Sequence, residues 1–379
     1  MSLKDILYFA YKYYYTSPLL PEDNSFREIK DKETLPAHDF ETKLTLSVGG
    51  DLMPYKIINR NSARHLWDHI GPDFFGSDIV FANLETPLDT SRSAGYVPEV
   101  MLNDMHFNID RTGFEIFSGN GQYKGFDVLS TANNHSMDMG AQGLINTLNF
   151  LEEEGIKSVG CATSEVRRKA PVIIEKNGIK VGFIAYTYSL NQFTVPEDAP
   201  YLVNLLPLNV PGCDISSIEA DTLACRNAGA DIVVCSVHCG NAYQAYPSAT
   251  TIHLFQRLFE TCGVDIIAGG HPHNLQPWHY YDFKDPFSGK QKKGFAIYSL
   301  ADFVAYDIYT WCHLCAYLKI NIGRNSSGEI VFSVDVNPLV MNYSNGELQL
   351  QYAVKVLNEK NLNAEQQDLK LLYDICMNP

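Results

Sequence analysis

Short apolar segments typical of strands alternate with amphipathic segments typical of helices along most of this 379-residue chain, and no other feature limits its fold as strongly. The strand candidates are residues 44–48, 78–82, 126–131, 231–237 and 264–268. The helix candidates that lie among them are residues 139–154, 215–228 and 250–261. Strands that alternate with helices predict a layered α/β domain with a largely parallel region.

Other segments predict a hairpin, a different kind of sheet and two flanking regions. Asn177-Gly178 lies between strand candidates 170–174 and 179–188 and predicts a β-hairpin turn. Residues 277–336 are rich in strand and turn signals and predict a second, more antiparallel sheet or sheet half. We expect three regions: an N-terminal helical segment and linker at 1–43, the main domain at 44–340, and a C-terminal extension ending in a helix at 341–379.

The charge balance limits the classes of partner. The chain has 44 acidic and 29 basic residues, which gives a formal charge of −15. A nucleic-acid binder needs a basic face, so we expect no nucleic-acid partner. The same charge repels an anionic polymer unless a local cation intervenes. Bound metal ions would give such a chain one locally positive pocket.

Cysteine usage and hydropathy bear on location. No segment approaches the ~20 apolar residues that span a bilayer, so we expect no transmembrane segment. The nine cysteines include several in apolar runs and are typical of buried free thiols in a reducing compartment, so we expect a cytoplasmic location. Cys312 and Cys315 have C-x-x-C spacing, but they stand alone in a strand-like run, which makes a redox or zinc role the weaker interpretation.

Polar residues with metal-ligand chemistry follow five of the strand candidates. They are Asp51, Glu85 with Asn83 before it, Asn134 with His135, His238, and the pair His271 and His273. Ligands in α/β folds gather beyond the carboxyl ends of strands. Each residue alone is more often a turn, a helix cap or a satisfied interior group. Their joint occurrence is harder to explain by packing and predicts a common site.

The residue types suit a transition-metal centre. Carboxylate, amide and imidazole ligands together favour manganese, iron or zinc, and they are too rich in nitrogen for calcium. Glu85 can bridge two ions, and paired ions hold a bridging hydroxide for an in-line displacement at phosphorus. His135, next to Asn134, can stay unligated and act as a general acid or as a donor to developing charge.

Five ordered motifs resemble the bacterial CapA family. They are Gly50-Asp51-Leu52-Met53, the segments 81–88, 131–140 and 238–273, and Tyr298-Ser299-Leu300-Ala301-Asp302-Phe303. The resemblance covers about residues 44 to 305. The CapA family is linked to synthesis of poly-γ-glutamate capsule, and it is similar to a branch of the calcineurin-like metallophosphoesterases.

The resemblance implies a four-layer α/β/β/α sandwich of two mixed sheets flanked by helices, with a metal centre at the strand ends. It implies one ion held by Asp51, Glu85 and His273, and another held by the group Glu85, Asn134, His238 and His271. It also implies the acid or charge-stabilising role for His135. Capsule-synthesis proteins are the partners that it suggests.

Several positions depart from the family pattern. Met53 stands where metallophosphoesterases usually have a histidine, so we expect the ion near Asp51 to bind weakly or not at all. Cys239 and Ala242 replace a tryptophan and a glutamate. Ala301-Asp302 replaces a Gly-Asn pair, and Asp302 is a candidate replacement carboxylate. Tyr243 is a further candidate that can line a substrate groove.

Two classes of function follow. The first is a metal-dependent hydrolase that attacks a phosphoester or an anionic polymer bond with metal-bound hydroxide, in a capsule or poly-γ-glutamate context. The alternative is a non-catalytic binding or assembly component for polyglutamate synthesis or export that retains the fold and at most one ion. A phosphatase or nucleotidase unrelated to capsule stands third. The chain has no P-loop, dinucleotide fingerprint, H-E-x-x-H or G-x-S-x-G motif, which excludes those chemistries.

Overall fold

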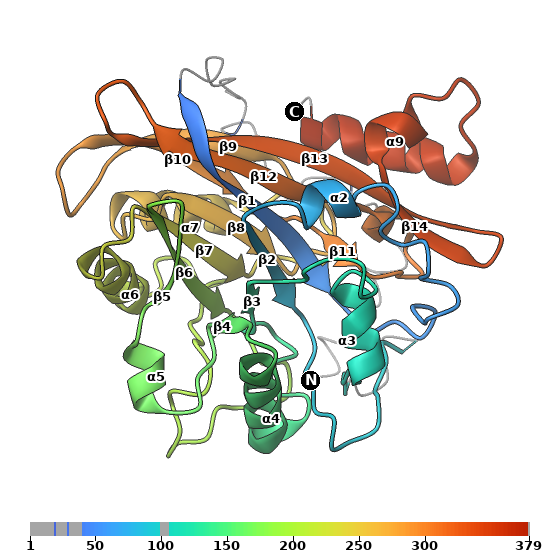
Figure 1. The fold of residues 1–379 in the computed structure, drawn as a ribbon, viewed down its shortest axis with the longest axis horizontal. Helices are drawn as coiled ribbons and strands as arrows, with labels where there is room; N and C mark the ends of the chain where they lie inside the picture. Colours follow the sequence, from blue (N-terminus) through green and yellow to red (C-terminus); the bar gives the residue numbers. More distant parts are fainter. Residues whose placement is uncertain (1–18, 20–28, 30–39, 99–105, 378–379) are drawn as a thin grey trace.

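The structure, a computed structural model, describes Leu19, Ile29, residues 40–98 and residues 106–377. Two mixed β-sheets pack against each other, and helices cover their outer faces (Figure 1). The expected sandwich of two mixed sheets flanked by helices is therefore confirmed. The helix expected within residues 1–16 lies outside the described residues.

The larger sheet has eight strands, and its centre is parallel. Strands β1 to β4 run parallel to one another, β11 adds a parallel partner to β1, and β12 to β14 continue the sheet as antiparallel neighbours. The strands are β1 (Glu41–Leu52), β2 (Ile79–Leu84), β3 (Val128–Ser130), β4 (Lys157–Val159), β11 (Asp302–Val304), β12 (Leu314–Arg324), β13 (Ile330–Ser344) and β14 (Glu347–Tyr352). The parallel strands bring their carboxyl ends to one edge.

The smaller sheet has six strands in the order β5-β6-β7-β8-β10-β9. Its four central strands are parallel, and the two edge strands are antiparallel. The strands are β5 (Val172–Lys176), β6 (Ile179–Thr187), β7 (Ile232–His238), β8 (Ile266–Gly270), β9 (Trp278–Lys284) and β10 (Gln291–Ile297). The hairpin prediction is confirmed, because β5 and β6 are joined by Asn177 and Gly178 with φ of 52° and 74°.

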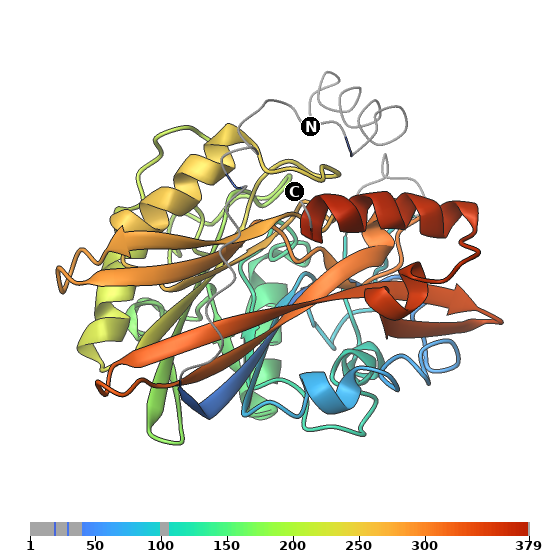
Figure 2. The same ribbon diagram turned by 90° about the horizontal axis from the view of Figure 1, so that it is seen from above.

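Helices cover both outer faces. Helices α6 (Ser216–Asn227) and α7 (Ala249–Glu260) bury apolar residues against the smaller sheet, in a cluster that includes Phe255 and Val233. Figure 1 places α2 (Gly71–Phe74), α3 (Arg111–Phe117) and α4 (Gly140–Glu153) beside the larger sheet. The main hydrophobic cluster fills the space between the sheets and continues under these helices. Seen from above, α9 (Ala364–Met377) and α8 (Ala353–Leu357) lie over the end of the larger sheet (Figure 2).

Residues 277–336 do not form a separate sheet: β9 and β10 extend the smaller sheet, whereas β11, β12 and β13 join the larger one. Hydrogen bonding to β1 and β8 decides this division, and local sequence does not reveal it. The alternative prediction of an antiparallel sheet half is confirmed, because β9 pairs antiparallel with β10 and β12 pairs antiparallel with β13. The expected boundary after residue 340 falls inside β13, and β14 continues the same sheet.

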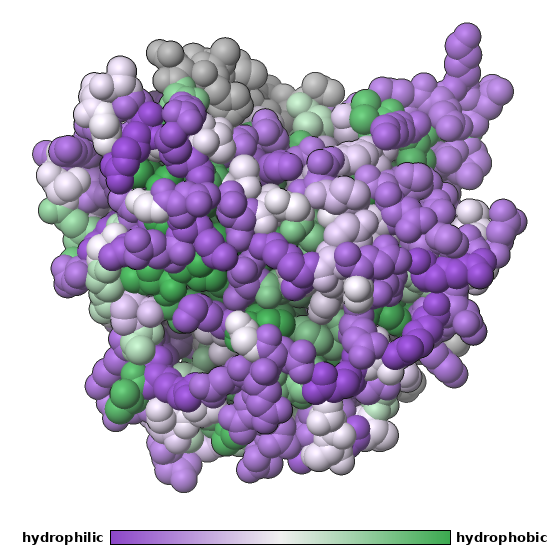
Figure 3. Space-filling view, viewed as in Figure 1, coloured by the Kyte–Doolittle hydropathy of each residue, from purple (hydrophilic) through white to green (hydrophobic). Residues whose placement is uncertain are grey.

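The surface is predominantly polar on the face seen in Figure 3, where apolar residues show mainly in recesses between hydrophilic ones. All nine cysteines lie in the described part of the chain as buried free thiols, as expected. Within the described residues, no helix combines the length and the apolar character needed to cross a membrane.

Candidate metal centre

The polar residues at the strand ends converge where the two sheets meet. The parallel register pairs Asp51 of β1 with both Asn83 of β2 and Asp302 of β11. In the smaller sheet, His238 at the end of β7 pairs with Gly270 at the end of β8. Each strand therefore delivers its ligand-type residue to the same level of the sandwich.

The close approach of the sheets depends on Gly270. A Cβ atom at this position would lie 2.8 Å from Oδ1 of Asp51 and 3.3 Å from Nδ1 of His238. The backbone N–H of His271 then donates to Oδ2 of Asp51 at 3.2 Å across the two sheets. A glycine at this position therefore lets the two halves of the site come together.

Six buried residues form three overlapping groups whose ligand atoms lie within 4.8 Å of one another. The groups are Glu85 with His271 and His273, Asp51 with His273 and Asp302, and Asp51 with Glu85 and His238. Five of these residues are sequence-predicted metal ligands, and Asp302 is the carboxylate suggested as a replacement.

Asn134 and His238 lie on opposite sheets and meet at this site. Oδ1 of Asn134 lies 2.7 Å from Nε2 of His238, and Oε1 of Glu85 lies 3.4 Å from the same nitrogen without hydrogen-bond geometry. Atoms bound to one ion lie roughly 3 Å apart, because each metal–ligand bond is about 2.1 Å long. The three side chains are spaced as ligands of one ion.

His273 and Asp302 form the second close contact. Nδ1 of His273 lies 2.8 Å from Oδ1 of Asp302, and the ring of Tyr243 stacks on His273 with centroids 5.4 Å apart. Asn83 donates from Nδ2 to Oδ1 of Asp51 at 2.8 Å, so it orients that carboxylate. Tyr243 and Asn83 therefore contact candidate ligands.

Tyr188 was missed by the sequence reasoning. It directly follows β6, and its hydroxyl lies 3.0 Å from Nε2 of His271. Tyr188 also follows a strand end, but the apolar pattern predicts strand over all of 179–188 and so gives no sign of a site residue there. Asn191, a few residues later, accepts from Nδ2 of Asn134 at 3.3 Å.

Four buried polar atoms at the centre have no hydrogen-bond partner. They are Oε1 and Oε2 of Glu85, Nδ1 of His271 and Oδ2 of Asp302, and their side chains are at most 5% exposed. A buried polar atom without a partner is costly, and a buried carboxylate more so. Bound cations would satisfy all four, so the donor set fits divalent metal ions.

Burial sets the protonation of two imidazoles. Burial lowers the pKa of His238, and burial together with the nearby imidazoles lowers the pKa of His271 well below its usual value. A lowered pKa favours the neutral form of each ring, which is the form that binds metal.

The carboxylates respond to burial and to one another. Burial and the charge of Glu85 raise the pKa of Asp51 well above its usual value. Burial also acts to raise the pKa of Glu85, but the imidazoles of His238, His273 and His135 outweigh it and lower that pKa. Burial lowers the pKa of His273, yet the charge of Asp302 reverses this and raises it.

Backbone strain gathers around the centre. Tyr243, His271, His273 and Ala301 have φ of 60°, 92°, 58° and 62°, a region that side-chain-bearing residues seldom adopt. Such conformations cost roughly 1–3 kcal/mol each and cluster at functional sites. The segment 271–273 therefore directs both histidines toward the ligand groups at a cost in backbone conformational energy.

His135 lies beside the ligand groups and not within them. Its ring stacks on Phe107 with centroids 3.8 Å apart, and Nδ1 lies 2.8 Å from Oδ2 of Asp138. Asp138 also accepts from the backbone N–H of Phe107 at 2.9 Å. This arrangement fixes the orientation of the ring, and Nε2 is the ring nitrogen that does not contact Asp138. Asp138 was not singled out from the sequence.

The departures from the family pattern are accommodated without disruption. Met53 is buried, and its N–H donates at 3.0 Å to the carbonyl of Val304, two residues after Asp302. Cys239 is buried, and burial raises its thiol pKa to about 12. Ala242 packs with Tyr243 beside Cys312.

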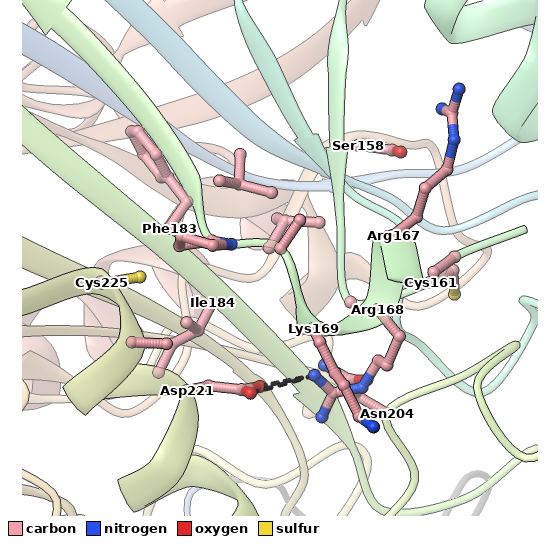
Figure 4. A pocket seen from close by; sticks show the side chains of 17 residues that line it. Ser158, Cys161, Arg167, Arg168, Lys169, Phe183, Ile184, Asn204, Asp221 and Cys225 are labelled. Carbon is pink, nitrogen blue, oxygen red and sulfur yellow. Dashed lines mark hydrogen bonds and ion pairs between the residues drawn. The ribbon is translucent and has the colours of Figure 1, made fainter. Parts of the chain in front are cut away.

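A separate pocket lies away from this centre. Figure 4 shows it between α5 (Glu165–Lys169), β6 and α6, with Arg168 paired to Asp221 at 2.9 Å. None of the candidate metal ligands lines it.

Residues 45–307 match the family model "Bacterial capsule synthesis protein PGA_cap". The chain is 28% identical to the capsule biosynthesis protein CapA of Bacillus anthracis over 80% of this chain and 68% of that protein. It is 26% identical to the PGA biosynthesis protein CapA of Bacillus subtilis over 88% of this chain and 82% of that protein.

Solved structures give weaker likenesses. NAD nucleotidase (NadN) of Haemophilus influenzae aligns with a TM-score of 0.44 at 12% identity, over 88% of this chain and 56% of that chain. A hypothetical protein from Thermus thermophilus aligns with a TM-score of 0.43 at 15% identity, over 78% of this chain and 99% of that chain.

Proposed function

The chain belongs to the bacterial capsule synthesis protein PGA_cap family, and from this premise we propose that it is a metal-dependent hydrolase acting in poly-γ-glutamate capsule synthesis. The observation that carries the proposal is the set of four buried, unpartnered polar atoms on Glu85, His271 and Asp302. A hydrolase needs such a preformed donor set, whereas a purely structural core has no reason to retain it.

The donor set divides into two subsites that share Glu85. Asp51, His273 and Asp302 form one, and their ligand atoms lie within 4.8 Å of one another. Asn134, His238 and His271 would hold the other together with Glu85. Asp302 supplies the ligand that Met53 does not, so we propose that the first subsite is filled despite this departure.

Divalent ions at these subsites would supply charge stabilisation and lower the pKa of bound water. The chain's own residues supply the proton and the orientation. His135 can donate from Nε2 to a leaving group, because Asp138 accepts from Nδ1 and stabilises the charged ring. Phe107 excludes water from one face of that ring.

The substrate we propose is an anionic polymer or a phosphoester. The relatives' names refer to capsule and PGA biosynthesis, which favours a γ-glutamyl bond, while the ligand types favour a phosphoester. A −15 chain would approach either substrate only through a site made locally positive by its ions.

The alternative is a binding or assembly component that does no chemistry. Met53 favours it, because loss of a nitrogen ligand weakens one subsite. Asp302 argues against it, since a carboxylate aligned with Asp51 by the parallel register compensates for that loss.

The test measures metal content and hydrolysis on the full chain. The protein is stripped with a chelator, reloaded with Mn²⁺ and assayed on bis(4-nitrophenyl) phosphate and on poly-γ-glutamate. We expect two ions per chain and hydrolysis of at least one substrate, both reduced in His271→Ala. His253→Ala, which alters an exposed histidine of α7, should match the wild type. Bound metal without hydrolysis of either substrate would favour the binding component, and no bound metal would refute both subsites.

A further inference from the structure

A third group of ligand-type side chains adjoins the two proposed subsites. Asp302, Asp307 and Cys312 each place one ligand atom within 4.8 Å of the others, and all three side chains are buried. Asp302 begins β11, Asp307 lies in the loop that follows, and Cys312 lies in the 3₁₀ helix η2 (Thr310–His313). One short segment therefore contributes the whole group.

Asp302 belongs to two of the groups, the one with Asp51 and His273 and the one with Asp307 and Cys312. Its Oδ1 contacts His273, whereas its Oδ2 has no hydrogen-bond partner although the residue is only 1% exposed. A buried carboxylate oxygen without a donor is strongly unfavourable unless a cation is bound. This unpartnered oxygen is the feature that indicates a ligand, apart from the proximity of the three residues.

The Asp307 carboxylate is held in place from outside the group. The hydroxyl of Tyr55 donates to Oδ2 at 2.8 Å, and the backbone N–H of Tyr309 donates to Oδ1 at 2.8 Å. Each carboxylate oxygen can accept more than one interaction. Donors of this kind orient metal-binding carboxylates in known sites.

We propose that Asp302, Asp307 and Cys312 form a third metal subsite, selective for a thiophilic divalent ion such as Zn²⁺. The proposal rests on the proposed function in so far as Asp302 is shared with the subsite of Asp51 and His273. On binding, the Cys312 thiol loses its proton to solvent and the sulfur–metal bond replaces the S–H bond. No oxidant or reductant is needed.

Ligand softness makes the third subsite chemically different from the other two. Oxygen and imidazole ligands accept manganese, whereas a thiolate favours zinc or cobalt. The chain would therefore hold two classes of metal ion, of which only the one in the third subsite has a thiolate ligand.

Cobalt substitution gives the sharpest test. The full chain is stripped of metal and titrated with Co²⁺ while the near-ultraviolet thiolate-to-cobalt charge-transfer band is followed. We expect the band in the wild type and its loss in Cys312→Ser, with bound cobalt reduced by one ion per chain. Cys315→Ala is the matched control: Cys315 is also buried and near Asp302, but it belongs to none of the groups found among the described residues. It should keep the band.

The outcomes separate this inference from the proposed function. Cobalt that binds without a charge-transfer band would overturn the third subsite and leave the other two standing. Failure to bind any cobalt would overturn all three. If Cys312→Ser fails to fold, the proposal can still be tested on the wild type. X-ray absorption of the zinc-loaded protein should show a sulfur atom bound to zinc, and a spectrum with only nitrogen and oxygen neighbours of zinc would contradict the proposal.

Discussion

The hydroxyl of Tyr188 lies 3.0 Å from Nε2 of His271, and Nδ1 of the same ring is buried without a partner. Tyr188 therefore decides which imidazole nitrogen remains for an ion. Groups that orient a ligating histidine in this way commonly change metal affinity by about 10–100-fold when they are removed.

We predict that Tyr188→Phe weakens Mn²⁺ binding by roughly 10-fold. The ring and its packing remain, so the loss should come from freedom of the His271 ring. Calorimetric titration of the metal-stripped protein measures the affinity.

Tyr186→Phe is the matched control for this change. Tyr186 lies on β6, the strand that Tyr188 follows, but its hydroxyl contacts Asp221 and Arg168, away from the centre. It should leave metal affinity unchanged. Equal weakening in both variants would show that Tyr188 acts through general stability and not through His271.

Glu85→Gln should weaken metal binding without stabilising the metal-free protein. Both carboxylate oxygens of Glu85 are buried without hydrogen-bond partners, but the nearby imidazoles favour its charged form, so loss of the charge should not raise the free energy of unfolding of the metal-free protein. The wild type should gain about 2.7 kcal/mol at a metal concentration 100-fold above Kd, and the variant much less. Denaturant unfolding with and without Mn²⁺ measures both terms.

Glu115→Gln, which removes an exposed carboxylate paired with Arg60, should change neither term appreciably. If Glu85→Gln gained as much from Mn²⁺ as the wild type, Glu85 would not be a bridging ligand.

His135→Ala should lower kcat by about 10²–10⁴-fold on the substrate that the wild type hydrolyses, with metal content unchanged. Asp138→Asn should lower kcat by a smaller factor, because the ring keeps its position on Phe107 but loses the carboxylate that stabilises its charge. Steady-state kinetics with parallel metal analysis separates the two effects.

An exposed pair supplies the control for His135. Nδ1 of His65 lies 2.7 Å from Oδ2 of Asp68 with the same i,i+3 spacing. His65→Ala should leave kcat intact. Loss of metal from His135→Ala would mean that His135 is a ligand and not an acid.

The strand-end rule accounts for most of what the sequence predicted. Asp51, Glu85, Asn134, His238 and His271 follow or end parallel strands, and the alternation of strands and helices is visible locally, so their convergence could be inferred without coordinates. The resemblance to a known family added the split between two ions.

Long-range pairing accounts for what could not be predicted. β1 continues past Gly49 and Gly50 to Leu52 because both β2 and β11, the latter some 250 residues later, pair with Asp51 and Leu52. The pairing with β11 brings Asp302 to the centre. Asp307 and Cys312 lie in a loop and a short 3₁₀ helix, whose paths depend on packing and not on periodicity. The sequence therefore offered only C-x-x-C spacing, which gave no indication that Cys312 lies beside Asp302.

Away from the centre, His279 gives a pH-dependent stability that can be tested without metal. Burial lowers the pKa of His279 to about 4, and its Nε2 lies 3.1 Å from the Tyr298 hydroxyl. Because the unfolded chain has a pKa near ~6.5, the unfolded state binds a proton between pH ~6.5 and ~4 while the folded state does not. The free energy of unfolding should therefore be unaffected by this group above pH ~6.5, and should fall by up to about 3 kcal/mol as the pH drops to ~4.

His279→Gln should flatten this part of the stability curve, since the amide can accept from Tyr298 and does not titrate. Chemical unfolding of metal-free protein at several pH values between 4 and 8 measures the slope. His253→Gln alters an exposed histidine and should retain the wild-type slope. A buried neutral imidazole lowers the free energy of unfolding in the pH range where only the unfolded chain takes up the proton. If the slope in His279→Gln were the same as in the wild type, the acid sensitivity would therefore arise from other groups.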